Sequence, residues 1–147
     1  MIQKMSHTGI YVLDQDEAKD FYVNKLGFEL KTDYTAPNGF RWLTVAPKGQ
    51  KEIEIALTKV GSGRESSRGK DTEQEIKKDV DAIAALVKKG WFNAGVFHTA
   101  DCRKTYEEYK AKGVEFLSPP KDEFYGVVAV FKDPFGNMIS MNQPKNS

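Results

Sequence analysis

The spacing of apolar residues changes repeatedly along the first part of the chain, and each change marks the boundary of a predicted element. Helical spacing over residues 16–25 predicts a helix whose apolar face consists of Ala18, Phe21, Tyr22 and Leu26. Gly27 follows, where a helix commonly ends in a residue with positive φ. Apolar runs bounded by turns with Pro, Asn and Gly predict extended segments at 6–12, 28–32, 40–46 and 52–58. This part of the chain is therefore expected to fold as a strand, a helix and three further strands.

The second part of the chain has the same order of elements. Strands are predicted at 96–99, 114–117, 127–131 and 138–142, and a helix capped by Asp101 is predicted at 102–112. The segment 25–30 resembles the segment 111–116, and the glycine of the first, Gly27, is 86 residues before that of the second, Gly113. The same offset aligns Glu54 with Ser140. We therefore predict an α+β fold of two β-α-β-β-β modules, 1–58 and 96–147, within one domain that spans residues 1–147.

The segment between the modules, 59–95, begins with a loop. Gly and Ser are frequent at 61–70, which predicts a flexible connector. The alternative is a basic lid over an anionic ligand, formed by Arg64, Arg68 and Lys70, because function concentrates in long loops.

A helix is predicted after this loop, at 72–89. Thr72 and Glu75 have the spacing of a capping box, and Gly90 suits the end of a helix. A helix of this length is marginal without tertiary packing. It is expected to dock through the apolar residues that recur on one face, Ile76, Val80, Ile83 and Val87.

The composition of the 147-residue chain restricts the class of partner. Lys and Arg number 22 against 21 Asp and Glu, so no strong field of one sign attracts nucleic acid or an anionic membrane surface. A small molecule is the expected partner. The one cysteine, Cys102, excludes an internal disulfide, and the sequence shows neither a secretion signal nor a membrane-spanning stretch. A cytoplasmic protein is expected.

The chain has two histidines, His7 and His98, and each lies in a predicted strand that leads into a helix. They are 91 residues apart rather than 86, which we attribute to a longer connection at 13–15 in the first module. Matching positions in two modules would offer two imidazoles to a shared pocket. Because imidazole is the commonest metal ligand among side chains and the usual proton shuttle near neutral pH, the pair is the leading functional candidate.

Three motifs accompany the paired modules: the strand at 6–12, the helix segment 18–22 followed by Leu-Gly-Phe at 26–28, and the turn Asp-Pro-Phe-Gly-Asn at 133–137. In this combination the chain resembles the vicinal oxygen chelate superfamily, which contains glyoxalase I, extradiol dioxygenases, fosfomycin resistance enzymes and bleomycin resistance proteins. The resemblance covers nearly the whole chain outside 60–92. It implies that the strands of each module curl into part of a cup. Two cups, in one chain or across a dimer, would enclose a ligand cavity.

The resemblance also implies a metal site on the first and last strands of the modules. His7, Glu54 and His98 match three of the family's ligand positions, and Ser140 stands at the fourth, where the family usually has glutamate. Because the neutral hydroxyl of serine is a poor ligand, a site with four protein ligands is not expected. Two imidazoles and one carboxylate would bind zinc, iron, manganese, nickel or cobalt and leave positions open for substrate oxygens. Strand alternation alone does not separate Glu54 from Glu52 as the carboxylate ligand.

Aromatic residues on the predicted strands and their flanking loops are candidates for the wall of this cavity. They are Tyr11, Phe40, Trp42, Phe92, Phe124 and Tyr125. Most aromatic residues of a small domain belong to its core. We expect Tyr11, Trp42 and Tyr125, together with Ser140, to contact the bound molecule.

Two further residues have reactive or charged groups. Arg41, between two aromatic residues, is a candidate anchor for a carboxylate or phosphonate, although a strand arginine more often points to water. Cys102 lies in the first turn of a predicted helix, which lowers a thiol pKa, but the neighbouring Asp101 opposes this effect. Cys102 is therefore expected to be buried and inert.

Two functions remain open on these residues. The first is a metal-dependent enzyme, a lyase or dioxygenase that acts on a small oxygen-rich or electrophilic molecule, with His7, Glu54 and His98 as ligands. The second is a metal-free protein that binds an antibiotic in a dimer cleft, as bleomycin resistance proteins do. The two histidines favour the first, and the loss of the fourth ligand at Ser140 favours the second. A homodimer is expected in both cases, because open cups leave apolar sheet edges for a second chain to cover.

Overall fold

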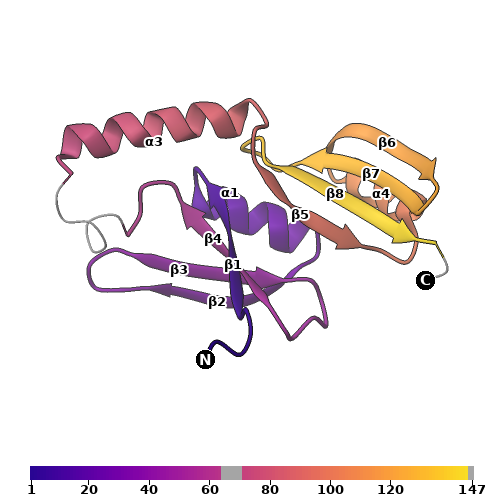
Figure 1. Cartoon of the computed structure of the whole chain (residues 1–147), viewed down its shortest axis with the longest axis horizontal. Helices are drawn as coiled ribbons and strands as arrows, with labels where there is room; N and C mark the ends of the chain where they lie inside the picture. The colour runs from indigo at the N-terminus through magenta and orange to yellow at the C-terminus, as the bar shows by residue number, and fades with distance from the viewer. Residues whose placement is uncertain (64–70, 146–147) are drawn as a thin grey trace. The chain divides into compact units, whose positions relative to one another are not determined.

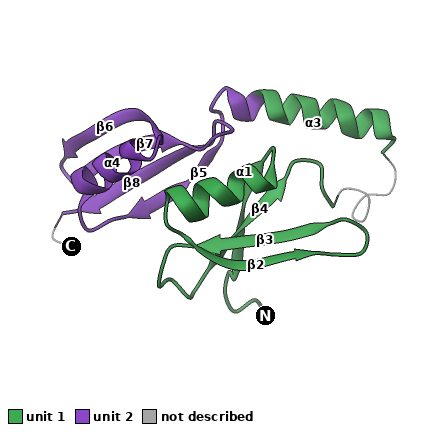
Figure 2. Cartoon of the chain, turned by 180° about the vertical axis from the view of Figure 1, so that it is seen from behind, with its two compact units in different colours: residues 1–85 green, residues 86–147 purple. Residues whose placement is uncertain are grey.

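The computed structural model describes residues 1–63 and 71–145 (Figure 1). The chain divides into two compact units, Met1–Ala85 and Leu86–Ser147, and each contains its own four-stranded mixed sheet (Figure 2). Both units have the order strand, helix and three strands, which confirms the α+β fold with two repeated modules that the sequence predicts.

The sheet of the first unit consists of β1 (His7–Val12), β2 (Glu29–Thr35), β3 (Arg41–Ala46) and β4 (Glu54–Lys59). Their order across the sheet is β1-β4-β3-β2, with β1 parallel to β4 and the other neighbours antiparallel. The paired residues of β3 and β4 include Thr44 and Ala56. Further along these strands the Gln15 side chain bridges them, because its Nε2 donates to the main-chain oxygens of Arg41 at 3.2 Å and Leu57 at 2.9 Å.

The helix predicted at 16–25 is present but changes its winding midway. The α-helix α1 (Gln15–Lys19) continues as the π-helical segment η1 (Asp20–Lys25). The wider turn closes with a hydrogen bond from Leu26 N to Phe21 O at 2.9 Å. The four apolar residues of the predicted face are all buried, namely Ala18, Phe21, Tyr22 and Leu26. Because either winding buries these residues, their spacing does not reveal the π turn.

The sheet of the second unit consists of β5 (Asn93–His98), β6 (Glu115–Glu123), β7 (Gly126–Lys132) and β8 (Met138–Pro144). Their order is β5-β8-β7-β6, which repeats the topology of the first sheet. Helix α4 (Cys102–Ala111) lies against one face of this sheet (Figure 1). Asp101 caps the helix as predicted, since its carboxylate accepts a hydrogen bond from Lys104 N at 3.0 Å.

Helix α3 (Glu73–Lys88) follows the first module and matches the predicted helix closely. The capping box is confirmed: Glu75 N donates to Thr72 Oγ1 at 3.2 Å, and Thr72 N donates to Glu75 Oε2 at 2.7 Å. Gly90 ends the helix region with φ 82°. Of the four residues expected to dock the helix, Val87 is fully buried, and the other three are half-buried, namely Ile76, Val80 and Ile83.

A buried carboxylate organises the turn between β7 and β8. Asp133 is 2% exposed, and its Oδ1 accepts hydrogen bonds from the main-chain N of Phe135, Gly136 and Asn137 at 3.0, 3.1 and 3.0 Å. Its Oδ2 accepts a hydrogen bond from Asn137 Nδ2 at 2.8 Å. Gly136 has φ 114°, and a Cβ at this position would lie 2.3 Å from the main-chain oxygen of Val87. The turn therefore requires an acidic residue at its start and a glycine where it approaches α3.

Candidate functional site

The two faces of the first sheet differ in burial. In β1, Ile10 and Val12 are buried whereas His7 and Tyr11 are exposed, because successive side chains of a strand point to opposite faces. The face with the buried residues contacts α1, and the opposite face, which we call the open face, carries His7.

His7 and Glu54 stand side by side on the open face. The parallel register of β1 and β4 pairs them, and His7 Nε2 lies 3.8 Å from Glu54 Oε2. The two side chains are 37% and 33% exposed, so a small molecule can reach both. The other ring nitrogen of His7, Nδ1, lies 2.9 Å from Ser6 Oγ. The register also distinguishes the two candidate carboxylates: Glu52 precedes β4 and is exposed, so Glu54 is the carboxylate beside His7.

A buried threonine orients the carboxylate of Glu54. Thr44 on β3 is 0% exposed, and its hydroxyl donates a hydrogen bond to Glu54 Oε1 at 2.7 Å. This bond leaves Oε2 on the side of His7. Sequence reasoning missed Thr44, because a threonine within a strand is common without any functional role. The signal is the pairing of β3 with β4: Thr44 stands opposite Ala56, two residues from Glu54 and therefore on the same face.

Trp42 adds an aromatic surface to this polar pair. Its ring centroid lies 5.5 Å from that of His7, with an angle of 53° between the ring planes. Tyr34, its cross-strand partner on β2, is 60% exposed. We call His7, Trp42, Thr44 and Glu54 the His7 site. It combines an imidazole, an oriented carboxylate and an indole, which together can bind the polar edge and the ring of a small aromatic molecule.

Three of the other predicted site residues lie on the second unit. His98 is exposed at the end of β5, and Ser140 is half-buried on β8. Tyr125 is 48% exposed and makes an edge-to-face contact with Phe124 at a centroid distance of 5.0 Å. Tyr11, on the first unit, lies toward the end of β1 remote from His7. The structure thus brings His7, Glu54 and Trp42 together, whereas the roles of the remaining residues stay predictions.

The two histidines do not occupy matching strand positions, so the expectation that they are equivalent is wrong. His7 begins β1 and pairs with Glu54, whereas His98 ends β5 and the partner of Ser140 is Val96. A longer first connection does not explain their spacing either, because two residues separate β1 from α1 and three separate β5 from α4. Each histidine precedes a helix in the sequence, but the pairing of its strand with the last strand of the unit sets its register.

A divalent metal would find two of its predicted ligands on the open face. Two ligands at about 2.1 Å from a tetrahedral zinc ion lie about 3.4 Å apart. His7 Nε2 and Glu54 Oε2, at 3.8 Å, would have to approach each other slightly to share one ion. Within residues 1–63 and 71–145, no three His, Cys, Asp or Glu side chains gather as a set of metal ligands. His7 and Glu54 therefore fit a metal as a pair of ligands and do not form a complete ligand set.

Arg41 is engaged by the carboxylates of Asp33 and Asp16. Its Nε and Nη2 donate to the two carboxylate oxygens of Asp33 at 2.8 and 3.0 Å, and its Nη1 donates to Asp16 Oδ1 at 2.6 Å. Lys19 Nζ also donates to Asp33, at 2.9 Å. The hydrogen bonds from Arg41 and then Lys19 hold the pKa of Asp33 well below its usual value, and those to Asp33 and Asp16 raise the pKa of Arg41. Arg41 thus ties α1 to the sheet and does not point to water, and its role as an anchor for a ligand stays a prediction.

The remaining candidates fall into three groups. None of the six aromatic residues proposed for the cavity wall belongs to the buried core. Cys102 is fully buried, its Sγ lies 3.9 Å from Met141 O, and burial raises the pKa of its thiol, as expected for an inert cysteine. The basic lid of Arg64, Arg68 and Lys70, the alternative given for the loop at 61–70, lies outside the described residues.

No helix among residues 1–63 and 71–145 is both long enough and apolar enough to cross a bilayer.

Comparisons with known proteins agree with this fold. YetH, an uncharacterized protein of Bacillus subtilis (strain 168), is 31% identical over 143 residues, which cover 97% of this chain and 100% of YetH. The crystal structure of UcmS2 has 40% identity and a TM-score of 0.84, with 97% of this chain and 98% of that chain covered. TnmS3, an antibiotic binding protein from Streptomyces sp. CB03234, has 29% identity and a TM-score of 0.71, with 98% of both chains covered.

These matches extend over nearly the entire chain, so they concern the whole fold and not a local motif. A family model, Glyoxalase/Bleomycin resistance protein/Dioxygenase superfamily, matches residues 4–141, which extend from before β1 into β8 and include the helix between the modules. The repeated strand order and the match together show that the chain belongs to the glyoxalase/bleomycin resistance protein/dioxygenase superfamily.

Proposed function

We propose that the chain binds a small molecule with an aromatic ring and a polar edge at the His7 site, in the manner of an antibiotic-binding protein. The observation that carries the proposal is the grouping of Trp42, His7 and the oriented carboxylate of Glu54 on one accessible face. The 29% identity to TnmS3, an antibiotic binding protein, supports it. The members of this superfamily have many different activities, so membership does not identify the activity of this chain. The proposal therefore depends on the side chains of the site.

Each side chain of the site has a distinct task in this proposal. A ligand hydroxyl about 2.8 Å from both polar atoms would donate to Glu54 Oε2 and interact with His7 Nε2, a length that is usual for such bonds. The 3.8 Å between these two atoms leaves room for one shared oxygen in front of them. Thr44 keeps the carboxylate in place, so little side-chain entropy is lost on binding. Trp42 would cover one face or edge of the ligand ring.

Calorimetric titration with 2,3-dihydroxynaphthalene tests this assignment, because the probe has an aromatic system and vicinal hydroxyls. We expect Trp42→Ala to weaken binding about tenfold, which corresponds to about 1.4 kcal/mol of aromatic contact and buried area. Glu54→Gln should weaken it as well, because the amide no longer provides a charged acceptor. The dimethoxy analogue of the probe, which has no donor, should bind more weakly than the diol.

The matched control is Trp91→Ala, which removes the other tryptophan of the chain. Trp91 is 73% exposed and is not one of the four residues of the His7 site, so its loss should leave the affinity for the diol unchanged. Equal effects of Trp42→Ala and Trp91→Ala, or equal binding of diol and dimethoxy analogue, would show that the His7 site is not the binding site.

A second candidate function is favoured by the pairing of His7 with Glu54 in adjacent strands. These residues would hold two coordination positions of a divalent metal, and such an ion would supply Lewis-acid chemistry to a substrate oxygen. His98 as a third ligand stays a prediction from the resemblance, as does the homodimer. In this case His7 and Glu54 would hold the ion, and Thr44 would keep the carboxylate in place.

Titration with zinc, nickel and manganese separates the two candidates. A metal site predicts binding that is lost in His7→Ala and in Glu54→Gln, because each variant removes a ligand. Ser140→Glu should tighten binding if its position completes the site. Glu52→Gln is the matched control and should change nothing, since Glu52 lies outside β4. If the parent chain binds none of the three ions and Ser140→Glu gains no affinity, the metal candidate is rejected and the metal-free binding function remains.

A further inference from the structure

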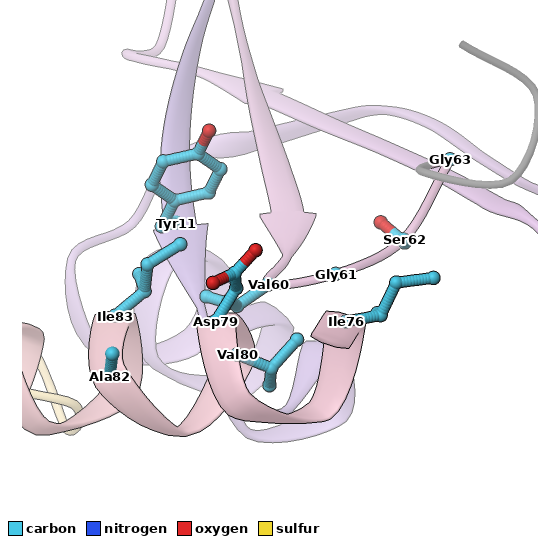
Figure 3. Close-up of a pocket in the computed structure, with 10 residues that line it drawn as sticks. All are labelled: Tyr11, Val60, Gly61, Ser62, Gly63, Ile76, Asp79, Val80, Ala82 and Ile83. Atoms are coloured by element: carbon cyan, nitrogen blue, oxygen red, sulfur yellow. The ribbon is translucent and has the colours of Figure 1, made fainter. Parts of the chain in front are cut away.

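The first unit contains a pocket that is separate from the His7 site. It lies between α3 and the ends of β1 and β4, with a volume of about 400 Å³ (Figure 3). The helix contributes Ile76, Asp79, Val80 and Ile83 to its lining, and the strands contribute Tyr11 and, just after β4, Val60. Tyr11 is four residues from His7, a separation of about 13 Å along an extended strand. The two sites are thus at different ends of β1.

Close packing forms one side of this pocket. Gly61 has φ 90°, and a Cβ at this position would lie 2.6 Å from Val80 Cγ2. Only a glycine lets the turn after β4 approach the helix so closely. The helix and the turn thus pack against each other and form one wall of the pocket. Val80 belongs to the face of α3 that the sequence predicts to dock.

The lining combines apolar side chains with polar groups, and among the lining residues that the structure describes Asp79 has the only charge. The ten lining residues within the described part of the chain include no lysine, arginine or histidine. Within the described part of the chain, the carboxylate of Asp79 has no hydrogen-bonding or ion-pair partner. In Figure 3 the Asp79 carboxylate extends from the helix toward Tyr11 and Val60, beside the apolar side chain of Ile83. A negative group at an apolar wall selects for a ligand that combines a ring with a cation.

The volume indicates the size of the ring system that fits into the pocket. An apolar cavity of about 150 Å³ holds a benzene molecule. A pocket of about 400 Å³ therefore accepts a two-ring molecule with a short side chain.

We propose that this pocket is a second small-molecule site that binds an apolar one- or two-ring molecule with a protonated amine. The rings lie between the apolar side chains of α3 and the strand ends, and the amine pairs with Asp79. The proposal does not depend on the function of the His7 site, because it uses none of the residues of that site.

Tryptamine is a suitable probe, because it combines two fused rings with one amine. In two-dimensional NMR of the labelled full chain, we expect amide shifts concentrated at residues 60–63 and 76–83, with saturation below about 10 mM, as is usual for a ligand of this size. Tryptophol has the same rings with a neutral hydroxyl, and indole-3-propionate has an anion. Tryptophol should bind about fivefold more weakly and the anion more weakly still, since a partly exposed ion pair contributes modestly.

Asp79→Asn should reduce the affinity for tryptamine about fivefold and leave that for tryptophol unchanged. The control Asp81→Asn removes the same charge from the same helix, where Asp81 is outside the lining and pairs with Lys77 at 3.0 Å. It should leave tryptamine binding unchanged. The proposal is overturned if tryptamine does not bind, if tryptophol binds equally well, if both aspartate variants behave alike, or if the shifts cluster elsewhere. Shifts confined to the Trp42 indole would assign the amine to the His7 site instead.

Discussion

Gly136→Ala is expected to lower the free energy of unfolding by about 3 kcal/mol, through backbone strain and steric overlap together. The residue has φ 114°, a conformation that L side chains rarely adopt, and a Cβ would lie 2.3 Å from the Val87 main-chain oxygen. The next nearest atom is Lys88 Cα at 3.0 Å. Both contacts are thus with main-chain atoms, which cannot move aside as the end of a flexible side chain can. The turn or the end of α3 would have to move. Urea unfolding followed by circular dichroism measures the change.

The matched control for this prediction is Gly39→Ala. Gly39 also has a positive φ, 91°, but nothing lies within 4 Å of a Cβ at that position. It should show the backbone strain alone, about 1 kcal/mol. If Gly136→Ala destabilises no more than Gly39→Ala, then the turn does not approach α3 as closely in solution.

Asp133→Ala is expected to lower the free energy of unfolding by about 4 kcal/mol, because it leaves several buried donors without an acceptor. Three main-chain amides and the Asn137 side chain donate to the Asp133 carboxylate within 3.1 Å. The total stability of a domain is about 5–15 kcal/mol, so this single change would remove a large part of it. Unfolding in urea at neutral pH measures the loss.

Asp14→Ala provides the comparison for an aspartate with one exposed hydrogen bond. Asp14 accepts a bond from Glu17 N at 2.8 Å at the start of α1. The loss of such a cap costs about 1 kcal/mol. Equal losses for the two aspartate variants would mean that the hydrogen bonds of Asp133 are not the reason why the turn requires it.

The family motif at 133–137 has a structural role in this chain. The hydrogen bonds of Asp133 and the close approach of Gly136 fix the turn that leads into β8, the strand that carries Ser140. These residues are on the same turn, so the effects of Gly136→Ala and Asp133→Ala should not be additive. The motif identifies the fold, whereas the chemistry of the site depends on residues of other strands.

The sequence predicts several residues of the His7 site. It does not predict the others, because their positions depend on how the strands pair. The alternation of β1 and β4 predicts that His7 and Glu54 lie on a face opposite to the apolar residues, which the structure confirms for Ile55 and Leu57. The choice of Glu54 over Glu52 rested on alignment with Ser140, and the pairing of β1 with β4 now supports it. Thr44 was missed because a strand threonine is common without a functional role, and only the pairing of β3 with β4 brings it to Glu54, ten residues away.

The sequence by itself determined the local elements, since each depends on contacts between neighbouring residues. The capping box of Thr72 and Glu75, the cap at Asp101 and the buried face of the first helix all follow from spacing and residue type. The repeat of two modules also follows, because the same pattern of periods occurs twice.

Only the tertiary structure decided the strand register, and with it the groups that meet. A shift of a few residues preserves the local pattern of β5 but changes the neighbour of Ser140 from His98 to Val96. The same holds for Arg41, whose partners Asp16 and Asp33 come from a helix and another strand. Local periodicity specifies which face of an element is buried. The alignment of elements depends on contacts between residues that are distant in the sequence, and no local pattern records them.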